Sequence, residues 1–258
     1  MKLRRRCVFG AIGALVFGGL AAVSAGTALS ADPSLETVKT RGALIVGTDI
    51  PYGVMQFIDA SGKPAGIDIE IAQEITADLG VKLTLETMPF KELFGALKAG
   101  RVDAVISAVT ITEERQKEML FSAPYMDAGM SIAVAETTTD VMGEKDLTGK
   151  TVGVLAGTVG EKLMTKSAHV EASNLKRYEN NDERLKDLVN GKIDAAIVHF
   201  VTKRPSKIKL LSPPLTQSFY GVVTKLGDEA LMDAVNFTLR RIKRDGRLED
   251  IKNKYINQ

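Results

Sequence analysis

Short apolar runs and amphipathic segments alternate along most of the chain. Residues 43–47 (ALIVG) and 102–109 (VDAVISAV) are typical of buried strands, and 81–86 (VKLTLE) alternates as a half-buried strand does. The spacing of apolar residues predicts an amphipathic helix over 66–79, ended by Gly80. Thr112 is a candidate N-cap for a short helix whose first turn carries Glu113 and Glu114. We therefore expect β and α elements in turn from residue 43 onward.

A second block repeats this order of elements. Its predicted strands are 151–155, 175–178 and 193–198, and its predicted helices are 159–167 and 182–189. Two further helical segments, 228–244 and 247–256, are divided at Asp245-Gly246. Alternating strands and helices predict an α/β fold with mainly parallel sheets and helices on both faces.

Two segments, one in each block, have the same character. KAGRVDAVISA at 98–108 and VNGKIDAAIVH at 189–199 each combine a helix end, a glycine, a basic residue and an apolar-Asp-Ala strand. This similarity predicts two similar lobes and argues against a solenoid of many repeats. In such sheets, ligands bind outside the carboxyl ends of the strands.

The first 31 residues have the layout of an export signal. A basic head (MKLRRR) is followed by an apolar stretch over 7–23 and a small, polar stretch over 24–31. This order predicts a secretory signal peptide, because the apolar stretch is short for a membrane span. A membrane anchor is the alternative. Residues 1–31 are therefore expected to be removed on export to the periplasm.

Removing the signal peptide changes the composition in two ways. The whole chain has 258 residues, a formal net charge of +2 and one cysteine. The signal contains four of the 34 basic residues, none of the 32 acidic residues, and Cys7, so the rest carries a charge of −2 and no cysteine. A charge this small argues against a nucleic-acid partner, and a chain without cysteine has no disulfide or thiolate metal site.

Common catalytic and cofactor motifs are absent from the sequence. It contains no GxxxxGK[ST], GxGxxG after a strand, HExxH, GxSxG or CxxC. His169 and His199 are its only histidines, so a histidine-rich metal site is not available. We expect no catalytic residues, metal or cofactor.

Two cationic or dipolar features lie where predicted strands end. A guanidinium at Arg115 could hold a carboxylate through two parallel hydrogen bonds, although a solvated helix arginine is the alternative. The turn Gly157-Thr158-Val159-Gly160 joins a strand to a helix, and free N–H groups there suit an anion. An ordinary strand–helix turn is the alternative.

Other candidate ligand contacts also follow strands. Tyr52 and Phe90 could supply flat apolar walls, or could belong to the core. Asp49 could accept a hydrogen bond from a ligand, or cap a turn. His199 ends a predicted strand and is either structural or a ligand contact. The positive character of the predicted site is therefore local to Arg115 and to the helix start at Thr158.

Longer stretches resemble a known family. The stretch LIVGTDIPYGVMQF at 44–57, the combination of TIT-x-ER with FS-x-PY over 110–125, DLTGKTVGVLAGTVGE, GKIDAAIV and the final VNFTLRRIKRDGRLEDIKNKY are similar to the family-3 extracellular solute-binding proteins. These are periplasmic amino-acid-binding components of ABC transporters. The resemblance covers essentially all of the chain after the signal peptide.

The resemblance implies a type II periplasmic binding protein fold, in which two lobes are joined by two crossover strands. The lobes would close on a ligand. One lobe would contain 32–126 and 220–258, and the other 130–215. The hinges would lie near 127–129 and 215–219. Such a protein would be a monomer that delivers its ligand to a membrane permease.

The resemblance also implies roles for individual residues. Arg115, with Thr110, would bind the ligand carboxylate, and the aromatic rings of Tyr52 and Phe90 would enclose the ligand. Asp49 would contact and recognise the side chain of the ligand. The remaining contacts would come from the following residues: backbone groups near Ser107 and Ala108, and the helix start at Thr158.

Two positions depart from the family pattern. His199 stands where the amino-acid binders commonly have an aspartate for the ligand ammonium, and Val54-Met55 replaces a Pro-Phe pair. A neutral histidine accepts one hydrogen bond but supplies no opposite charge. The ligand is therefore expected to be a small polar carboxylate, either without an ammonium or with its ammonium held elsewhere, as by Asp49. The alternatives are an enzyme resembling the periplasmic cyclohexadienyl dehydratases on the same scaffold, or a ligand-sensing module for a separate receptor.

Overall fold

The structure is a computed structural model that describes residues 32–199 and 206–256. The predicted signal peptide, residues 1–31, lies outside this range. Among the helices of the described part, none is both long and apolar enough to cross a membrane.

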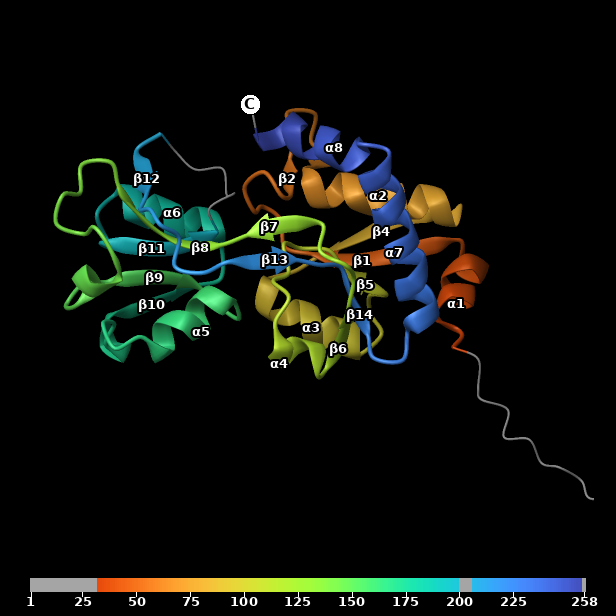
Figure 1. Ribbon diagram of the computed structural model, residues 1–258, viewed down its shortest axis with the longest axis horizontal. Helices are drawn as coiled ribbons and strands as arrows, with labels where there is room; N and C mark the ends of the chain where they lie inside the picture. The colour runs from red at the N-terminus through yellow and green to blue at the C-terminus, as the bar shows by residue number, and fades with distance from the viewer. Residues whose placement is uncertain (1–31, 200–205, 257–258) are drawn as a thin grey trace, which may run out of the picture. The chain divides into compact units, whose positions relative to one another are not determined.

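The first lobe is built on a five-stranded sheet in the order β4-β1-β5-β14-β6. β1 pairs in parallel with β4 and β5, whereas β14 pairs antiparallel with β5 and β6. Figure 1 shows this sheet between helices. Its strands are β1 (Ala43–Thr48), β4 (Lys82–Thr87), β5 (Ala104–Val105), β6 (Met119–Phe121) and β14 (Val223–Lys225).

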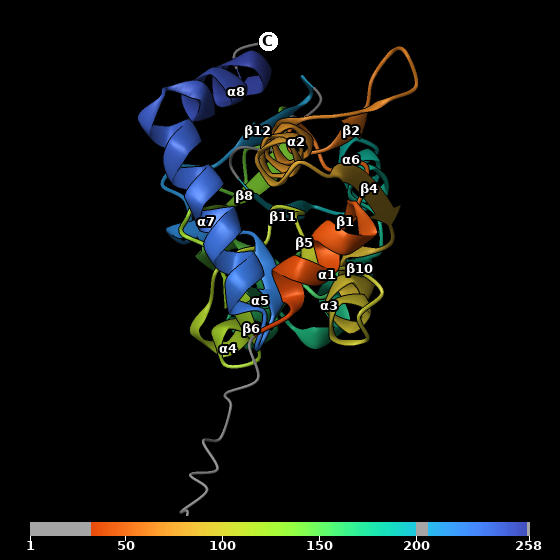
Figure 2. The ribbon, with the colours of Figure 1, turned by 90° about the vertical axis from the view of Figure 1, so that its right-hand side faces the viewer.

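Helices cover both faces of this sheet because its buried residues alternate between two clusters. Leu44 and Val46 of β1 pack into the cluster that contains residues of α1, α2, α7 and α8, whereas Ile45 packs with α3 on the other face. Figure 2 shows α7 beside α1. The helices of the lobe are α1 (Ser34–Arg41), α2 (Ile67–Leu79), α3 (Phe90–Lys98), α4 (Glu113–Gln116), α7 (Glu229–Arg244) and α8 (Arg247–Ile256), and a small hairpin contains β2 (Phe57–Ile58) and β3 (Pro64–Ala65).

The second lobe repeats this plan. Its sheet has the order β10-β9-β11-β8-β12, again with two parallel and two antiparallel pairings. Helix α5 packs on one face and α6 on the other. Its elements are β8 (Met130–Ala135), η1 (Glu144–Leu147), β9 (Val152–Leu155), α5 (Val159–Lys166), η2 (Ala172–Asn174), β10 (Leu175–Tyr178), α6 (Asn181–Val189), β11 (Ala195–His199) and β12 (Ile208–Leu210).

Two short strands connect the lobes. The chain leaves the first sheet through β7 (Met126–Ala128) and returns through β13 (Ser218–Tyr220), and these strands pair antiparallel. Figure 1 shows the pair between the two sheets. The two similar α/β lobes and two crossover strands predicted from the resemblance are therefore present, while the proposed lobe and hinge boundaries stay a prediction.

The repeated Asp in the two similar segments has one structural role. Asp103 Oδ2 accepts the N–H of Ile45 at 2.7 Å, and Asp194 Oδ2 accepts the N–H of Thr151 at 2.7 Å. Each carboxylate thus satisfies a backbone donor of the neighbouring parallel chain segment. The sequence similarity reflects a shared way of joining strands.

The strand predicted over 102–109 is wrong in length, since β5 has only two residues. Ala108 has φ 47°, in the left-handed region that a side chain disfavours, and its N–H donates to Asp68 Oδ2 at 2.6 Å. The backbone therefore leaves the sheet after Val105, and Ser107 and Thr110 fall at the edge where the first lobe faces the second.

Candidate functional site

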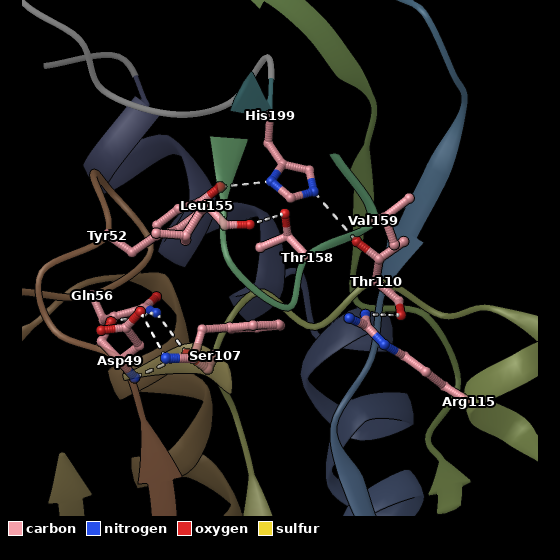
Figure 3. Close-up of a pocket in the computed structure, with 11 residues that line it drawn as sticks. Asp49, Tyr52, Gln56, Ser107, Thr110, Arg115, Leu155, Thr158, Val159 and His199 are labelled. Carbon is pink, nitrogen blue, oxygen red and sulfur yellow. Dashed lines mark hydrogen bonds between the residues drawn. The ribbon is translucent and has the colours of Figure 1, made fainter. Parts of the chain in front are cut away.

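Residues of both lobes converge on one enclosed cavity, shown in Figure 3. Its volume is about 10 Å³, roughly the space of a single ordered water. Eight of the nine predicted contact residues line it, and Ala108 does not. The eight are Asp49, Tyr52, Phe90, Ser107, Thr110, Arg115, Thr158 and His199.

Arg115 is a buried cation held across the cleft. It lies in α4, whose N-cap Thr112 accepts the Arg115 N–H as the sequence predicted. Nη1 donates to the Thr110 carbonyl at 3.0 Å, and Nη2 donates to the Gly157 carbonyl of the second lobe at 3.1 Å. Its guanidinium carbon also lies 4.9 Å from the centre of the Phe94 ring.

Burial lowers the pKa of Arg115 but leaves its guanidinium charged. Its exposed fraction is 7%, and within the described residues no carboxylate forms an ion pair with it. Burial lowers the pKa of Arg115 to about 10, against a smaller opposing effect of Glu114. The guanidinium is therefore charged at neutral pH, and its hydrogen-bond partners in the described residues are the two carbonyls, which makes it the strongest anion-binding group of the cavity.

His199, at the end of β11, contacts two hydroxyl groups of the first lobe. Nδ1 lies 2.6 Å from the Tyr52 hydroxyl and Nε2 lies 3.3 Å from the Thr110 hydroxyl, as the dashed lines in Figure 3 mark. Its ring also packs edge-on against Tyr220, with the centres 4.9 Å apart. Both ring nitrogens are thus within reach of hydroxyls that can donate or accept.

The surroundings of His199 keep its ring neutral. Burial lowers the pKa of His199 to about 3, and the positive charges of Arg184 and Arg115 lower it further in the same direction. A neutral imidazole donates through one nitrogen and accepts through the other. His199 therefore offers hydrogen bonds but no charge.

Asp49 follows β1 and makes the predicted cap-like contact, while its predicted contact with a ligand stays a prediction. Its Oδ2 accepts the N–H of Phe90, the first residue of α3, at 3.2 Å, which is a cap-like contact. Its carboxylate also lines the cavity. Burial raises the pKa of Asp49 to about 6, so a substantial fraction is protonated just below neutral pH.

The two aromatic residues occupy different surroundings. Phe90 packs edge-on against Phe94 and lies under the Arg115 guanidinium, 5.6 Å from ring centre to the guanidinium carbon. Tyr52 contacts His199 through its hydroxyl and edge-on through its ring. Both rings are buried and face the cavity, so they are walls as well as core.

The turn at Thr158 is partly occupied by its own side chains. Thr158 Oγ1 caps α5 by accepting the Glu161 N–H at 3.3 Å, and donates to the Leu155 carbonyl at 2.7 Å. The Gly157 N–H donates to Glu161 Oε2 at 2.8 Å. The backbone donors left for an anion are thus fewer than the sequence suggested.

Ala108 is the predicted contact that the structure places differently. Its backbone N–H donates to the buried Asp68, whose other carboxylate oxygen accepts the Tyr125 hydroxyl at 2.7 Å. Because this donor points at Asp68, it holds the turn and does not face the cavity. The neighbouring Ser107 does line the cavity, and its hydroxyl accepts from the Asp49 N–H at 3.0 Å.

Comparison with known proteins gives the same family as the sequence resemblance. The model of the bacterial extracellular solute-binding proteins, family 3, matches residues 44–258. The chain belongs to this family.

Named relatives and solved structures agree with this assignment. The L-cystine-binding protein TcyJ of Escherichia coli (strain K12) is 29% identical over 98% of this chain and 96% of that protein. The histidine-binding periplasmic protein of Salmonella typhimurium is 30% identical over 82% of this chain and 86% of its own. The crystal structure of the P235GK mutant of ArgBP from T. maritima has a TM-score of 0.83 and 31% identity, and covers 87% of this chain and 100% of its own.

Membership of the family-3 solute-binding proteins has two direct consequences. The fold is that of a type II periplasmic binding protein, as the resemblance implied. The chain is a binding protein and not an enzyme, since the family and its named relatives are binding proteins. The dehydratase alternative is therefore not favoured.

Three lining residues of this solute-binding protein were not predicted from the sequence. Gln56 donates to the Asp49 carbonyl and to Ser107 Oγ, both at 3.0 Å, whereas Leu155 and Val159 add apolar contact. In the sequence these residues look like ordinary core and turn positions. Val159 belongs to the turn identified in the sequence, although it was not named as a contact, and no local pattern separates Gln56 and Leu155 from their neighbours.

A fourth residue, Arg184 of α6, was also missed and acts on the site without lining it. Its exposed fraction is 2%. Nη1 donates to the Ile197 carbonyl at 2.7 Å and Nη2 to Asn181 Oδ1 at 2.6 Å, while Nε has no hydrogen-bond partner within the part of the chain that the structure describes. The structure buries residues 181, 184, 185 and 188 of α6, an i, i+3, i+4, i+7 stripe, but two of these residues are polar, so the apolar pattern of the sequence did not indicate Arg184.

Proposed function

We propose that this protein is exported to the periplasm, captures a small polar carboxylate of the amino-acid or amino-acid-like class, and delivers it to an ABC transporter permease. The observation that carries the proposal is Arg115, a buried guanidinium without a carboxylate partner in the described residues, in a cavity lined by both lobes. Relatives that bind cystine and histidine support the ligand class.

Contacts across the cleft support capture by hinge closure. Arg115 of the first lobe bonds Gly157 of the second, and His199 bonds Tyr52. Because the cavity between them is only about 10 Å³, an amino-acid-sized ligand requires the lobes to separate and close again. A bound carboxylate would take the place of the Gly157 carbonyl as the partner of Arg115, and contacts of the ligand with Thr158 of the second lobe would connect both lobes.

A ligand screen followed by one substitution tests this function. The mature protein, residues 32–258, is screened for thermal shifts with amino acids, opines and small organic acids, since a ligand at 100 times its Kd adds about 2.7 kcal/mol. The Kd of each binder is then measured by calorimetry. Arg115→Ala should weaken binding by roughly 10- to 150-fold, equivalent to about 1.5–3 kcal/mol for a charge-assisted hydrogen bond.

Arg101→Ala is the matched control. Arg101 belongs to the same lobe, but its side chain is 61% exposed and reaches Glu86 at 3.4 Å on the surface. Its loss should leave the Kd unchanged. Binding by the Arg115→Ala variant at the wild-type Kd would refute the assigned role and with it the carboxylate ligand.

A further inference from the structure

The turn between β5 and α4 presents polar groups of the first lobe to the cavity. Ser107 and Thr110 both line it, and the Thr110 hydroxyl lies 3.3 Å from His199 Nε2. The Thr110 carbonyl also accepts from Arg115 Nη1 at 3.0 Å. The conformation of residues 107–110 therefore decides where these groups stand relative to a ligand.

This turn has a backbone conformation that its own sequence does not favour. Within residues 32–199 and 206–256, Ala108 is the one residue other than glycine with a positive φ, at 47°. A Cβ makes the left-handed region unfavourable, and alanine has no polar side chain that could compensate through a local hydrogen bond. The turn therefore has to be held by a contact from another part of the fold.

A buried carboxylate at the start of α2 makes that contact. Asp68 is 0% exposed, and its Oδ2 accepts the Ala108 N–H at 2.6 Å. Its Oδ1 accepts the Tyr125 hydroxyl at 2.7 Å, so each oxygen has a partner and the carboxylate is fixed in orientation. Asp68 lies in the first turn of α2, where the helix dipole favours a negative charge. A hydrogen bond to such a carboxylate is stronger than one between neutral groups.

The far end of the turn is held separately, by the returning crossover segment. The Gly221 N–H donates to the Val109 carbonyl at 3.0 Å, and the Ile111 N–H donates to the Phe219 carbonyl at 2.9 Å. These bonds fix residues 109–111 beside β13 but do not involve the Ala108 N–H. The contact with Asp68 is thus what holds the strained part of the turn.

We propose that Asp68 is a positioning residue for ligand binding, which holds the Ala108 backbone so that Thr110 faces the cavity in the geometry that binding needs. This inference rests on the proposed function and adds a residue that does not line the cavity. Without the carboxylate, the strained turn is free to relax. The Thr110 carbonyl and hydroxyl then no longer hold Arg115 and the cavity wall in place.

Amide hydrogen exchange tests the hold on the turn without any ligand. Burial raises the pKa of Asp68 to about 7, so measurements are made at about pH 8, where the carboxylate predominates. The Ala108 amide should be protected in the wild type. Its exchange rate relative to the amides of β1 should rise roughly tenfold or more in Asp68→Ala, because a hydrogen bond to a charged acceptor is lost.

Two results of this experiment would overturn the proposal. One is an Ala108 amide without protection in the wild type, and the other is an Ala108 amide that keeps the wild-type ratio to β1 in the variant. Asp68→Leu, which fills the volume of the carboxylate without supplying an acceptor, is used if Asp68→Ala does not fold.

Calorimetry measures what the hold contributes to binding. The probe is the compound that binds the wild type most tightly in the screen of amino acids, opines and small organic acids. Its Kd should rise about tenfold or more in the variant without an acceptor. Asp68→Asn should keep the Kd within about threefold of the wild type, because its amide oxygen still accepts the Ala108 N–H. An unchanged Kd without the acceptor, or equal losses in the Asn and Ala variants, would refute the positioning role.

Ile75→Ala is the matched control for stability. Ile75 lies about two helical turns after Asp68 in α2 and is buried in the main core of the first lobe. Its truncation should lower the urea midpoint but leave residues 107–110 and their partners intact. The Kd should therefore stay at the wild-type value, and the Ala108 and β1 amides should accelerate together. A merely structural Asp68 would give this same pattern, and that outcome would overturn its assigned role.

The two measurements separate this inference from the proposed function. If carboxylates bind and depend on Arg115 but not on Asp68, the proposed function stands and the positioning role fails. If no carboxylate of the screen binds the wild type, the proposed function fails, while the exchange rates still decide whether Asp68 holds the turn.

Discussion

His199 links the chemistry of the cleft to the stability of the fold. It is 4% exposed, bonded to Tyr52 and Thr110, and its pKa is lowered from an ordinary value near 6.5 to about 3. In the unfolded chain the same ring takes up a proton as the pH falls below about 6.5. Since the folded ring stays neutral, acid favours the unfolded chain through this residue.

Substitution of His199 should therefore reduce the acid sensitivity of folding. Between pH 7.5 and pH 5 the histidine should cost the wild type about 2 kcal/mol of unfolding free energy, because only the unfolded state gains the proton. His199→Asn removes this titration, so its loss of stability over the same interval should be smaller by about that amount. Urea unfolding at the two pH values measures the difference.

The second histidine provides the comparison for this experiment. His169 lies in a half-exposed position after α5, so His169→Asn is the same chemical change outside the cavity, and the effect of His199→Asn is measured relative to it. Identical pH dependence in the wild type and the His199→Asn variant would mean that His199 takes up its proton in the folded protein as it does in the unfolded chain.

At the scale of elements, α2 begins at a glycine for steric reasons. Gly66 has φ 123°, and a Cβ on it would lie 2.4 Å from the Met55 carbonyl oxygen. The helix that follows buries Ile67, Ile71 and Ile75 in the main core of the first lobe. A close approach between the 54–56 turn and the start of α2 is thus needed before the helix can pack.

Gly66→Ala should destabilise the protein by about 2–3 kcal/mol, from the steric clash and the disfavoured φ. Gly95 is the matched control. It lies inside α3 with no atom within 4 Å of the added Cβ, so Gly95→Ala should stabilise by about 0.5–1 kcal/mol. Urea unfolding of both variants gives the comparison. Equal free energies of unfolding for the two would exclude the steric argument.

The elements that the sequence predicted well are those whose burial pattern is local. Helix α2 and strand β1 were visible because apolar periodicity and the stop at Gly80 lie within a few residues of each other. Strand β5 was predicted too long, because the contact that turns the backbone away joins Ala108 to Asp68, 40 residues apart. Such a long-range contact leaves no mark on the local pattern of apolar residues.

The site was predictable to a similar degree and for similar reasons. Charged and aromatic residues at strand ends, such as Arg115 and Tyr52, were identified because strand ends converge. Leu155 was missed because apolar lining has the pattern of a core, and of the turn that contains Val159 only Thr158 was named as a contact. Arg184 was missed because the segment NDERLKD is rich in charge and looks exposed, although the register of α6 buries it.

For the whole molecule, binding and closure are one process if ligand contacts connect the lobes. Two exposed ion pairs also span the cleft in addition to the buried contacts. Lys162 of α5 lies 2.7 Å from Glu114 of α4, and Lys91 lies 2.8 Å from Glu179. Each pair is present only when the lobes are together, so each adds a small, salt-sensitive preference for closure.

Reversing one of these charges should weaken ligand binding without touching the ligand. In Lys162→Glu the attraction to Glu114 becomes repulsion, which should raise the Kd of a bound carboxylate by about 3- to 10-fold at low salt. Adding Glu114→Lys restores opposite charges and should return the Kd to near the wild-type value. Lys98→Glu is the control, because Lys98 pairs with Glu118 inside the first lobe and its reversal does not oppose closure. Calorimetry at 20 mM and 1 M salt decides the matter: if Lys98→Glu and Lys162→Glu change the Kd alike, or the charge swap fails to restore it, these pairs do not contribute to closure.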